Sequence, residues 1–186
     1  MKLILIGYRA AGKTTVGRLL AEKIGIPFVD TDKVIEDEAG MPIREIIQAE
    51  GWSGFRQREA KAVKSLCNKG VCVVATGGGA VLSPANADVL KKEGILIYLK
   101  ASPQDIIERL KHDEQKKRTR PRFTDTGIEA ETLAVLHQRI PLYEALADYT
   151  ARTEAKGPLQ VVEEIYAHLL ETGEIAAINR LKKLSR

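Results

Sequence analysis

The eight residues Gly7–Thr14 constrain the fold of this chain more than any other segment. They read Gly-Tyr-Arg-Ala-Ala-Gly-Lys-Thr, which fits the spacing G-x-x-x-x-G-K-[ST] at every fixed position. An apolar run at residues 3–6 precedes them, and apolar residues three to four positions apart follow them. The order strand, glycine loop, helix is therefore predicted. In that order the loop N–H groups and the helix N-terminus point at an anion.

The chemistry of this loop indicates a bound nucleotide rather than a chance glycine-rich turn. The Lys13 ammonium can reach the β- and γ-phosphates, and the Thr14 hydroxyl is a ligand type that suits Mg²⁺. The residues of this segment predicted to bind ATP are Ala10, Ala11, Gly12, Lys13, Thr14 and Thr15.

Strand and helix patterns alternate along the rest of the chain. This alternation predicts a parallel sheet with helices on both faces. We expect an α/β fold with three α/β/α layers, a five-stranded parallel sheet and a mobile lid, which is the architecture of a small P-loop kinase. The predicted strands are residues 3–6, 26–29, 71–75, 95–99 and 149–151.

Two strands lead directly into candidate site residues. Asp30 and Asp32 follow the strand at 26–29, and ligands of open parallel sheets bind at the carboxyl ends of the strands. Thr31 or Asp32 can instead cap the next helix. Three glycines, residues 77–79, follow the strand at 71–75 and permit close approach of a ligand, although a simple turn remains possible there.

Positive charge is concentrated in two segments. Residues 109–122 hold seven Lys or Arg against two acids, and residues 173–186 hold four against one. The first segment contains Thr119-Arg120-Pro121 and indicates a local anion site, so we interpret residues 112–127 as a lid. The second is expected to be a basic helical tail. Neither has interleaved aromatic residues, so nucleic acid is not expected as a partner.

The length and the first residues bound the remaining possibilities. A chain of 186 residues predicts one main domain, here residues 1–172, followed by the tail. The apolar run before Gly7 is too short for a signal peptide or a membrane span, so a cytoplasmic protein without membrane contacts is expected. A monomer is also expected. Cys67 and Cys72 form no disulfide or metal pattern and are both expected to be buried.

Taken together, the motifs of residues 2–171 resemble the shikimate kinase family. The triple glycine and the two arginine motifs are more specific for this family than the phosphate loop. The resembling segments are Gly7–Thr15, Phe28–Asp32, Gly54–Glu59, Thr76–Val81, Thr119–Pro121 and Gln138–Tyr143. The sequence departs from the family pattern at Ala10, where glycine is usual, and at Arg122 and Phe123 of the lid.

The resemblance implies ATP-dependent phosphorylation of the 3-hydroxyl of shikimate, with Mg²⁺. It implies catalytic roles for Asp32, Lys13 and Arg120, and ATP contacts for Arg109 and Arg120 as well as the loop. The implied shikimate-binding residues are Asp32, Arg56, Gly77, Gly78, Gly79 and Arg139, and the implied metal ligands are Thr14 and Asp30.

Three alternatives remain open. Arg56 and Glu59 lie three residues apart on one predicted helix and can face one site, but they can instead form a surface ion pair without a role in binding. Gluconate and nucleoside monophosphate kinases share the fold and the lid, so the fold does not decide the substrate. A non-catalytic regulatory protein that retains the phosphate loop is the third, and it is disfavoured because all the acidic and arginine positions are present.

Overall fold

A single parallel sheet forms the centre of the molecule. The computed structural model describes residues 1–115 and 127–184, and every structural statement below refers to them. The strands lie in the order β2-β3-β1-β4-β5, and all four pairings are parallel, as predicted. Their bounds are β1 (Lys2–Ile6), β2 (Phe28–Asp30), β3 (Cys72–Ala75), β4 (Gly94–Lys100) and β5 (Tyr149–Arg152).

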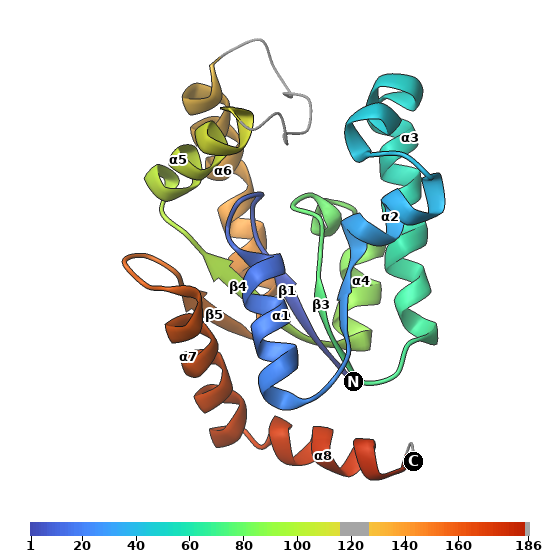
Figure 1. Cartoon of the computed structure of the whole chain (residues 1–186), viewed down its shortest axis with the longest axis vertical. Helices are drawn as coiled ribbons and strands as arrows, with labels where there is room; N and C mark the ends of the chain where they lie inside the picture. The colour runs from blue at the N-terminus through green and yellow to red at the C-terminus, as the bar shows by residue number, and fades with distance from the viewer. Residues whose placement is uncertain (116–126, 185–186) are drawn as a thin grey trace.

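Helices cover both faces of this sheet and make the predicted three layers. Helices α1 and α7 pack together on one face, and α4 and α6 contact β4 on the other (Figure 1). The helices are α1 (Lys13–Ile24), α2 (Thr31–Ala39), α3 (Ile43–Ser65), α4 (Pro84–Glu93), α5 (Pro103–Gln115), α6 (Ile128–Leu146), α7 (Pro158–Glu171) and α8 (Glu174–Leu184), with short 3₁₀ helices η1 (Leu66–Asn68) and η2 (Ala80–Leu82).

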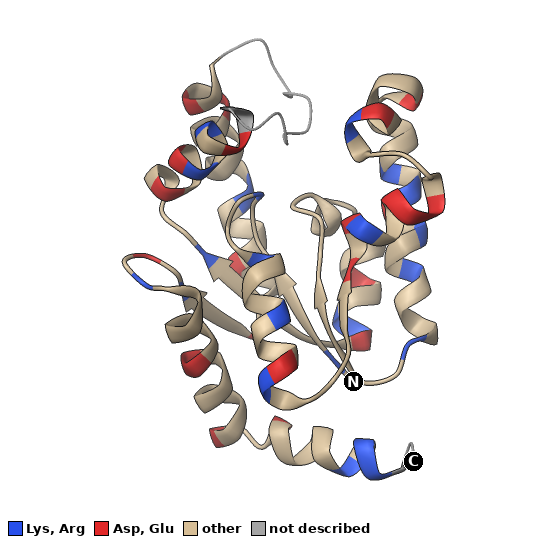
Figure 2. Cartoon of the chain, viewed as in Figure 1, with Lys and Arg blue, Asp and Glu red and all other residues tan. Residues whose placement is uncertain are grey.

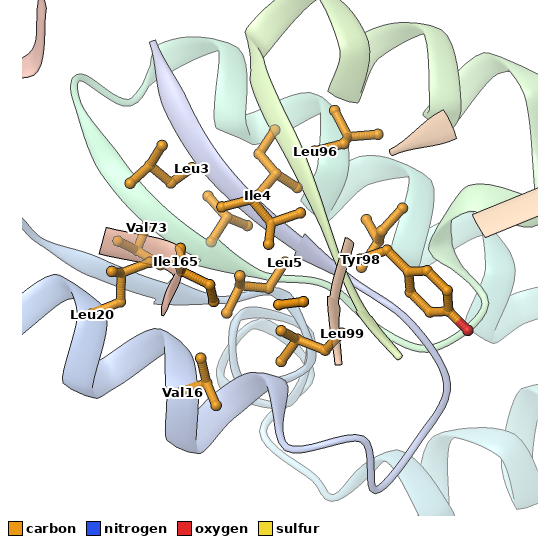
Figure 3. Close-up of a cluster of buried hydrophobic side chains, with 14 of the residues drawn as sticks. Leu3, Ile4, Leu5, Val16, Leu20, Val73, Leu96, Tyr98, Leu99 and Ile165 are labelled. Atoms are coloured by element: carbon orange, nitrogen blue, oxygen red, sulfur yellow. The ribbon is translucent and has the colours of Figure 1, made fainter. Parts of the chain in front are cut away.

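The central strand β1 is buried along its whole length, because both of its faces are covered. Side chains alternate between the faces of a strand, so Leu3 and Leu5 share one face and Ile4 lies on the other. Leu5 reaches α1, where Val16 and Leu20 complete the same apolar layer (Figure 3). Charged side chains gather on the surrounding helices rather than on the strands (Figure 2).

The strand order places the candidate residues together at one edge. Strands β1 and β3 are neighbours, and the connection from β1 runs toward β2 while that from β3 runs toward β4 in the opposite direction. Open α/β sheets bind ligands at such a reversal. The loop after β1, Asp30 at the end of β2 and the glycines after β3 all lie at this edge. Helices α2 and α3 rise on one side of it, and α5 and α6 on the other (Figure 1).

Some local predictions are confirmed and others are wrong. The break expected near residues 50–54 occurs at Gly51, where φ is 68° and ψ is 178° within α3. The predicted lid begins too early, because residues 112–115 continue α5. Cys72 is buried as expected, but Cys67 is exposed, since it lies in η1 at the surface.

The described part of the C-terminal segment packs against the main body as α8. Ile175 and Ile178 are buried in the main core. The ammonium of Lys182 donates a hydrogen bond of 2.9 Å to the carbonyl of Ile24, the last residue of α1. A cation therefore lies at the negative end of the helix that starts in the phosphate loop. Among the described helices, none has the length and apolar character needed to cross a membrane.

Candidate active site

The phosphate loop connects β1 to α1 through a backbone that suits its glycines. Gly7 has φ 135°, and a Cβ there would lie 2.8 Å from the carbonyl oxygen of Leu99. The Lys13 ammonium donates to the carbonyl oxygens of Gly7 at 2.9 Å and Tyr8 at 2.7 Å. The lysine is thus held over the loop, with its charge at the N-terminus of α1.

Ala10 shows a physical consequence of the departure from glycine. Its φ is 61°, in the left-handed region, where a side chain costs about 1 kcal/mol relative to glycine. The loop therefore adopts a glycine-like conformation despite the methyl group. Its carbonyl oxygen accepts a hydrogen bond of 3.0 Å from Nη1 of Arg109 on α5.

Two oxygen-bearing side chains meet where a divalent cation is expected. The Thr14 hydroxyl donates to Oδ2 of Asp30 at 2.7 Å. The other oxygen of Asp30 accepts from the N–H groups of Asp32 at 3.0 Å and Lys33 at 3.4 Å. Asp30 is therefore the N-cap of α2, and the expectation that Thr31 or Asp32 caps this helix was wrong because β2 extends to Asp30.

A cavity of about 760 Å³ lies above the phosphate loop. It is large enough for a nucleotide-sized ligand. Of the predicted site residues, those lining it are Ala10, Ala11, Gly12, Lys13, Thr14, Thr15, Asp30, Asp32, Gly78 and Arg109. Arg56, Gly77, Gly79 and Arg139 are not part of this lining.

The three glycines after β3 lie against three different groups. A Cβ at Gly77 would be 2.7 Å from Oε1 of Glu59 and 2.8 Å from Oδ1 of Asp32. One at Gly78 would be 2.9 Å from the backbone nitrogen of Arg9. A Cβ at Gly79 would lie 2.3 Å from Nη1 of Arg56. The segment thus touches the acidic strand end, the phosphate loop and one predicted carboxylate-binding arginine.

The same segment supplies two hydrogen-bond donors. All three glycines are buried, and the N–H of Gly77 donates to the Thr31 hydroxyl at 3.0 Å. The N–H groups of Gly78 and Gly79 have no acceptor among the residues that the structure describes. Buried backbone donors normally have a partner, so these two are suited to a ligand.

The two arginines predicted to bind a carboxylate converge on these glycines from different helices. Nη1 of Arg56 on α3 is 2.6 Å from Oε2 of Glu59, whose side chain is 1% exposed, so the pair is not the surface pair that was the alternative. Nη1 of Arg139 on α6 lies 3.4 Å from the carbonyl oxygen of Gly78. Both guanidinium groups therefore lie beside Gly78 and Gly79.

Two further contacts were not predicted from the sequence. Nη2 of Arg9 is 2.7 Å from Oε1 of Glu131 on α6, and the Glu131 side chain is fully buried. The Tyr143 hydroxyl donates to the carbonyl of Gly78 at 2.6 Å. Burial raises the pKa of Tyr143 to about 12, so it remains a donor at neutral pH. Two features of the sequence could have indicated these contacts: an arginine inside the phosphate loop, and the tyrosine of the Arg-x-Pro-Leu-Tyr motif.

One predicted residue cannot be placed. Arg120, assigned to catalysis and ATP binding, lies outside the described residues, as does most of the predicted lid at 112–127.

The parallel sheet, the phosphate loop with its lysine and the adjoining polar pocket define a P-loop kinase of small molecules. The family model described as shikimate kinase matches residues 9–170. A shikimate kinase of Syntrophus aciditrophicus is 43% identical over 171 residues, covering 88% of each chain. The chain belongs to the shikimate kinase family.

Solved structures agree with this assignment. The shikimate kinase of Acinetobacter baumannii in complex with shikimate superposes with a TM-score of 0.85 at 35% identity, covering 92% of this chain and 93% of that one. A gluconokinase of Sinorhizobium meliloti 1021 has a TM-score of 0.59 at 19% identity, covering 96% of both chains. That second likeness shows the shared fold alone.

Proposed function

We propose that this chain transfers the γ-phosphoryl group of ATP to the 3-hydroxyl of shikimate, giving shikimate 3-phosphate and ADP in aromatic amino-acid biosynthesis. The observation that carries the proposal is the convergence of Arg56 and Arg139 on Gly78 and Gly79, next to the phosphate loop. Two cations and two buried amide donors form a pocket suited to a small hydroxylated carboxylate.

The donor half of the reaction uses the loop and α1. Backbone N–H groups of residues 10–15 and the N-terminus of α1 bind the phosphates, and Lys13 neutralises charge as it develops on the transferring group. The Lys13 ammonium can leave the carbonyl oxygens of Gly7 and Tyr8 by rotation of its flexible side chain. Arg109 is proposed to contact the nucleotide, which is supported by its hydrogen bond to the Ala10 carbonyl and its position in the cavity lining.

Thr14 and Asp30 are proposed as the protein ligands of Mg²⁺. Their oxygens are 2.7 Å apart, and a hydroxyl plus a carboxylate is a donor set that suits this hard cation. Mg²⁺ commonly takes only one or two protein oxygens and completes its octahedron with phosphates and water. Bound there, the ion would neutralise charge on the phosphates.

The acceptor half uses Asp32 and the glycine segment. Asp32 lines the cavity and lies against Gly77, so its carboxylate can accept the proton of the attacking hydroxyl or orient it. Arg56 and Arg139 hold the carboxylate of shikimate by charge-assisted hydrogen bonds. Gly78 and Gly79 offer their N–H groups to the ring hydroxyls. Arg120 is proposed to contact the transferring phosphate during turnover.

The competing acceptors of this fold are gluconate and nucleoside monophosphates. A coupled assay of ADP release with each of the three substrates separates them. We expect turnover with shikimate at a kcat/KM at least about a hundred times higher than with the others, since the pocket is built for one carboxylate on a ring. Comparable turnover with gluconate would reject the proposed substrate.

We also infer that residues 1–172 carry the complete site and that the enzyme is a cytoplasmic monomer. ATP as donor supports the cytoplasm. Size-exclusion chromatography with light scattering tests the monomer, and a particle of twice the chain mass would reject it.

A further inference from the structure

The ion pair between Arg9 and Glu131 has no role in the proposed function, although one of its members belongs to the phosphate loop. Nη2 of Arg9 is 2.7 Å from Oε1 of Glu131, whose side chain is fully buried. The two residues are 122 positions apart in the sequence, so the pair joins the loop to the first turn of α6. Because a buried carboxylate is costly without a cation beside it, the Arg9 guanidinium is held in place by α6.

Directly after Arg9 the loop makes a turn in which glycine is the usual residue. The N–H of Ala11 donates to the carbonyl of Tyr8 at 3.3 Å, which closes a four-residue turn over residues 8–11. Ala10 is the third residue of this turn, and its φ is 61°. A positive φ at the third position favours glycine, because the Cβ of another residue crowds the backbone. The turn is therefore strained in this chain.

A strained residue persists only where its surroundings hold it. Two side chains restrain the backbone around Ala10. On one side Arg9 is bonded to Glu131 of α6, and on the other the Ala10 carbonyl accepts a hydrogen bond of 3.0 Å from Arg109 of α5. The bond from Arg109 is exposed to solvent, whereas the carboxylate of Glu131 is buried. Since solvent and salt screen a buried pair much less, the pair with Glu131 is the stronger restraint.

The turn orients groups that bind the nucleotide in the proposed function. Its first carbonyl, that of Tyr8, also accepts a hydrogen bond of 2.7 Å from the Lys13 ammonium. Its last residue, Ala11, belongs to the run of N–H groups at residues 10–15 that face the phosphates. If Ala10 relaxed to a negative φ, these groups would change direction. A nucleotide would then bind only the fraction of molecules in which the turn is intact, and its apparent affinity would fall.

We propose that Arg9 and Glu131 are positioning residues for the nucleotide: their ion pair holds the turn at residues 8–11 in a conformation that Ala10 does not favour by itself. The inference rests on the nucleotide site of the proposed kinase. It concerns the donor half of the reaction and does not depend on the identity of the acceptor.

The test is Glu131→Gln, with Glu144→Gln as matched control. Glu144 lies on the same helix and pairs with Lys100 at 2.7 Å, but it does not line the nucleotide cavity. Calorimetry without acceptor should show that Glu131→Gln raises the Kd for ADP about fivefold to thirtyfold. That range is the population ratio that corresponds to the cost of a left-handed alanine. Glu144→Gln should leave the Kd unchanged, and an unchanged Kd in Glu131→Gln would overturn the proposal.

Ala10→Gly makes the test specific for the backbone. Glycine adopts a positive φ without strain, so the ion pair becomes largely dispensable. In the Ala10→Gly background, Glu131→Gln should raise the Kd for ADP by less than about twofold. A pair that served only the stability of the fold would give the same rise in both backgrounds, and equal rises would overturn the proposal.

The double variant Arg9→Met with Glu131→Met separates loss of the turn from loss of the fold. An apolar pair of similar volume can replace a buried ion pair without loss of stability, but it does not fix the direction of the side chain. This variant should therefore keep the circular dichroism spectrum of the wild type and bind ADP more weakly, and wild-type affinity would overturn the proposal. Failure of the proposed function would appear differently, as a wild type that binds ADP but does not phosphorylate shikimate.

Discussion

Replacing Gly77, Gly78 and Gly79 by alanine, one at a time, is expected to give three different kinetic defects. None of the three has φ in the left-handed region, so the backbone tolerates a methyl group at each position. The effect of each substitution therefore follows from what the added methyl touches. Gly70→Ala is the matched control, because a Cβ there has open space around it.

At Gly79 the methyl carbon would lie 2.3 Å from Nη1 and 2.5 Å from Nη2 of Arg56, so the guanidinium must move. It is the end of a flexible side chain, and the fold can accommodate the shift. Loss of its hydrogen bond to the shikimate carboxylate should cost about 1.5–3 kcal/mol, or about 10- to 150-fold in the KM for shikimate. The KM for ATP should not change.

At the other two positions the obstacle differs. The methyl of Gly78→Ala would lie 2.9 Å from the backbone nitrogen of Arg9, so rotation of a side chain cannot relieve the contact. The phosphate loop must shift, so the KM for ATP should rise and the melting temperature should fall. The methyl of Gly77→Ala would lie 2.8 Å from Oδ1 of Asp32, so kcat should fall by about 10²–10⁴ as the acid is displaced. It would also lie 2.7 Å from Oε1 of Glu59, the partner of Arg56, so the KM for shikimate should rise as well.

Steady-state ADP release, with each substrate varied in turn, separates the three patterns, and thermal melts report the stability of each variant. The reasoning is refuted if the three variants share one pattern. It is refuted equally if Gly79→Ala raises the KM for ATP and leaves that for shikimate unchanged.

Three further predictions concern the loop and the core. Lys13→Ala should lower kcat by about 10²–10³ because a fixed cation is lost at the transition state, and a variant with wild-type kcat would contradict its role. Ala10→Gly should raise the unfolding free energy by about 1 kcal/mol by relieving the left-handed φ of 61°, measured by urea unfolding; a loss of stability would count against strain there. Burial raises the pKa of Tyr143 to about 12 from 10.0, so the folded state binds this proton more tightly than the unfolded chain. The stabilisation from this proton is present below pH 10 and should be lost as the pH rises toward 12. The free energy of unfolding should therefore fall less steeply with pH in Tyr143→Phe than in the wild type, and equal slopes would contradict the raised pKa.

Local patterns in the sequence were sufficient for the sheet and the phosphate loop. The central strands β1, β3 and β4 are short apolar runs that burial on both faces explains, and the glycine spacing of the loop is specific. The edge strands β2 and β5 are only partly buried and have a weaker pattern. The N-cap of α2 is Asp30, just before the predicted Thr31 or Asp32. The apolar pattern does not mark the end of a strand whose last residue is an acid. The end of α5 was placed too early because residues 112–115, which read His-Asp-Glu-Gln, continue the helix without adding any apolar periodicity.

The contacts that complete the candidate site have no local signature. Arg9 and Glu131 are 122 positions apart, and Tyr143 and Gly78 are 65 apart. Which side chain of α6 meets which carbonyl depends on how the helix packs on the sheet, and this packing is decided by the core as a whole. The family motifs placed Arg139 and Tyr143 near the site, but not the bond that joins the latter to Gly78.

Phosphorus NMR of the product formed from ATP and shikimate by the purified wild-type protein tests the central claim most directly. The account predicts one new phosphate monoester, coupled to the proton on carbon 3 of shikimate and formed in step with ADP. Release of inorganic phosphate alone, or a monoester at another hydroxyl, would contradict it.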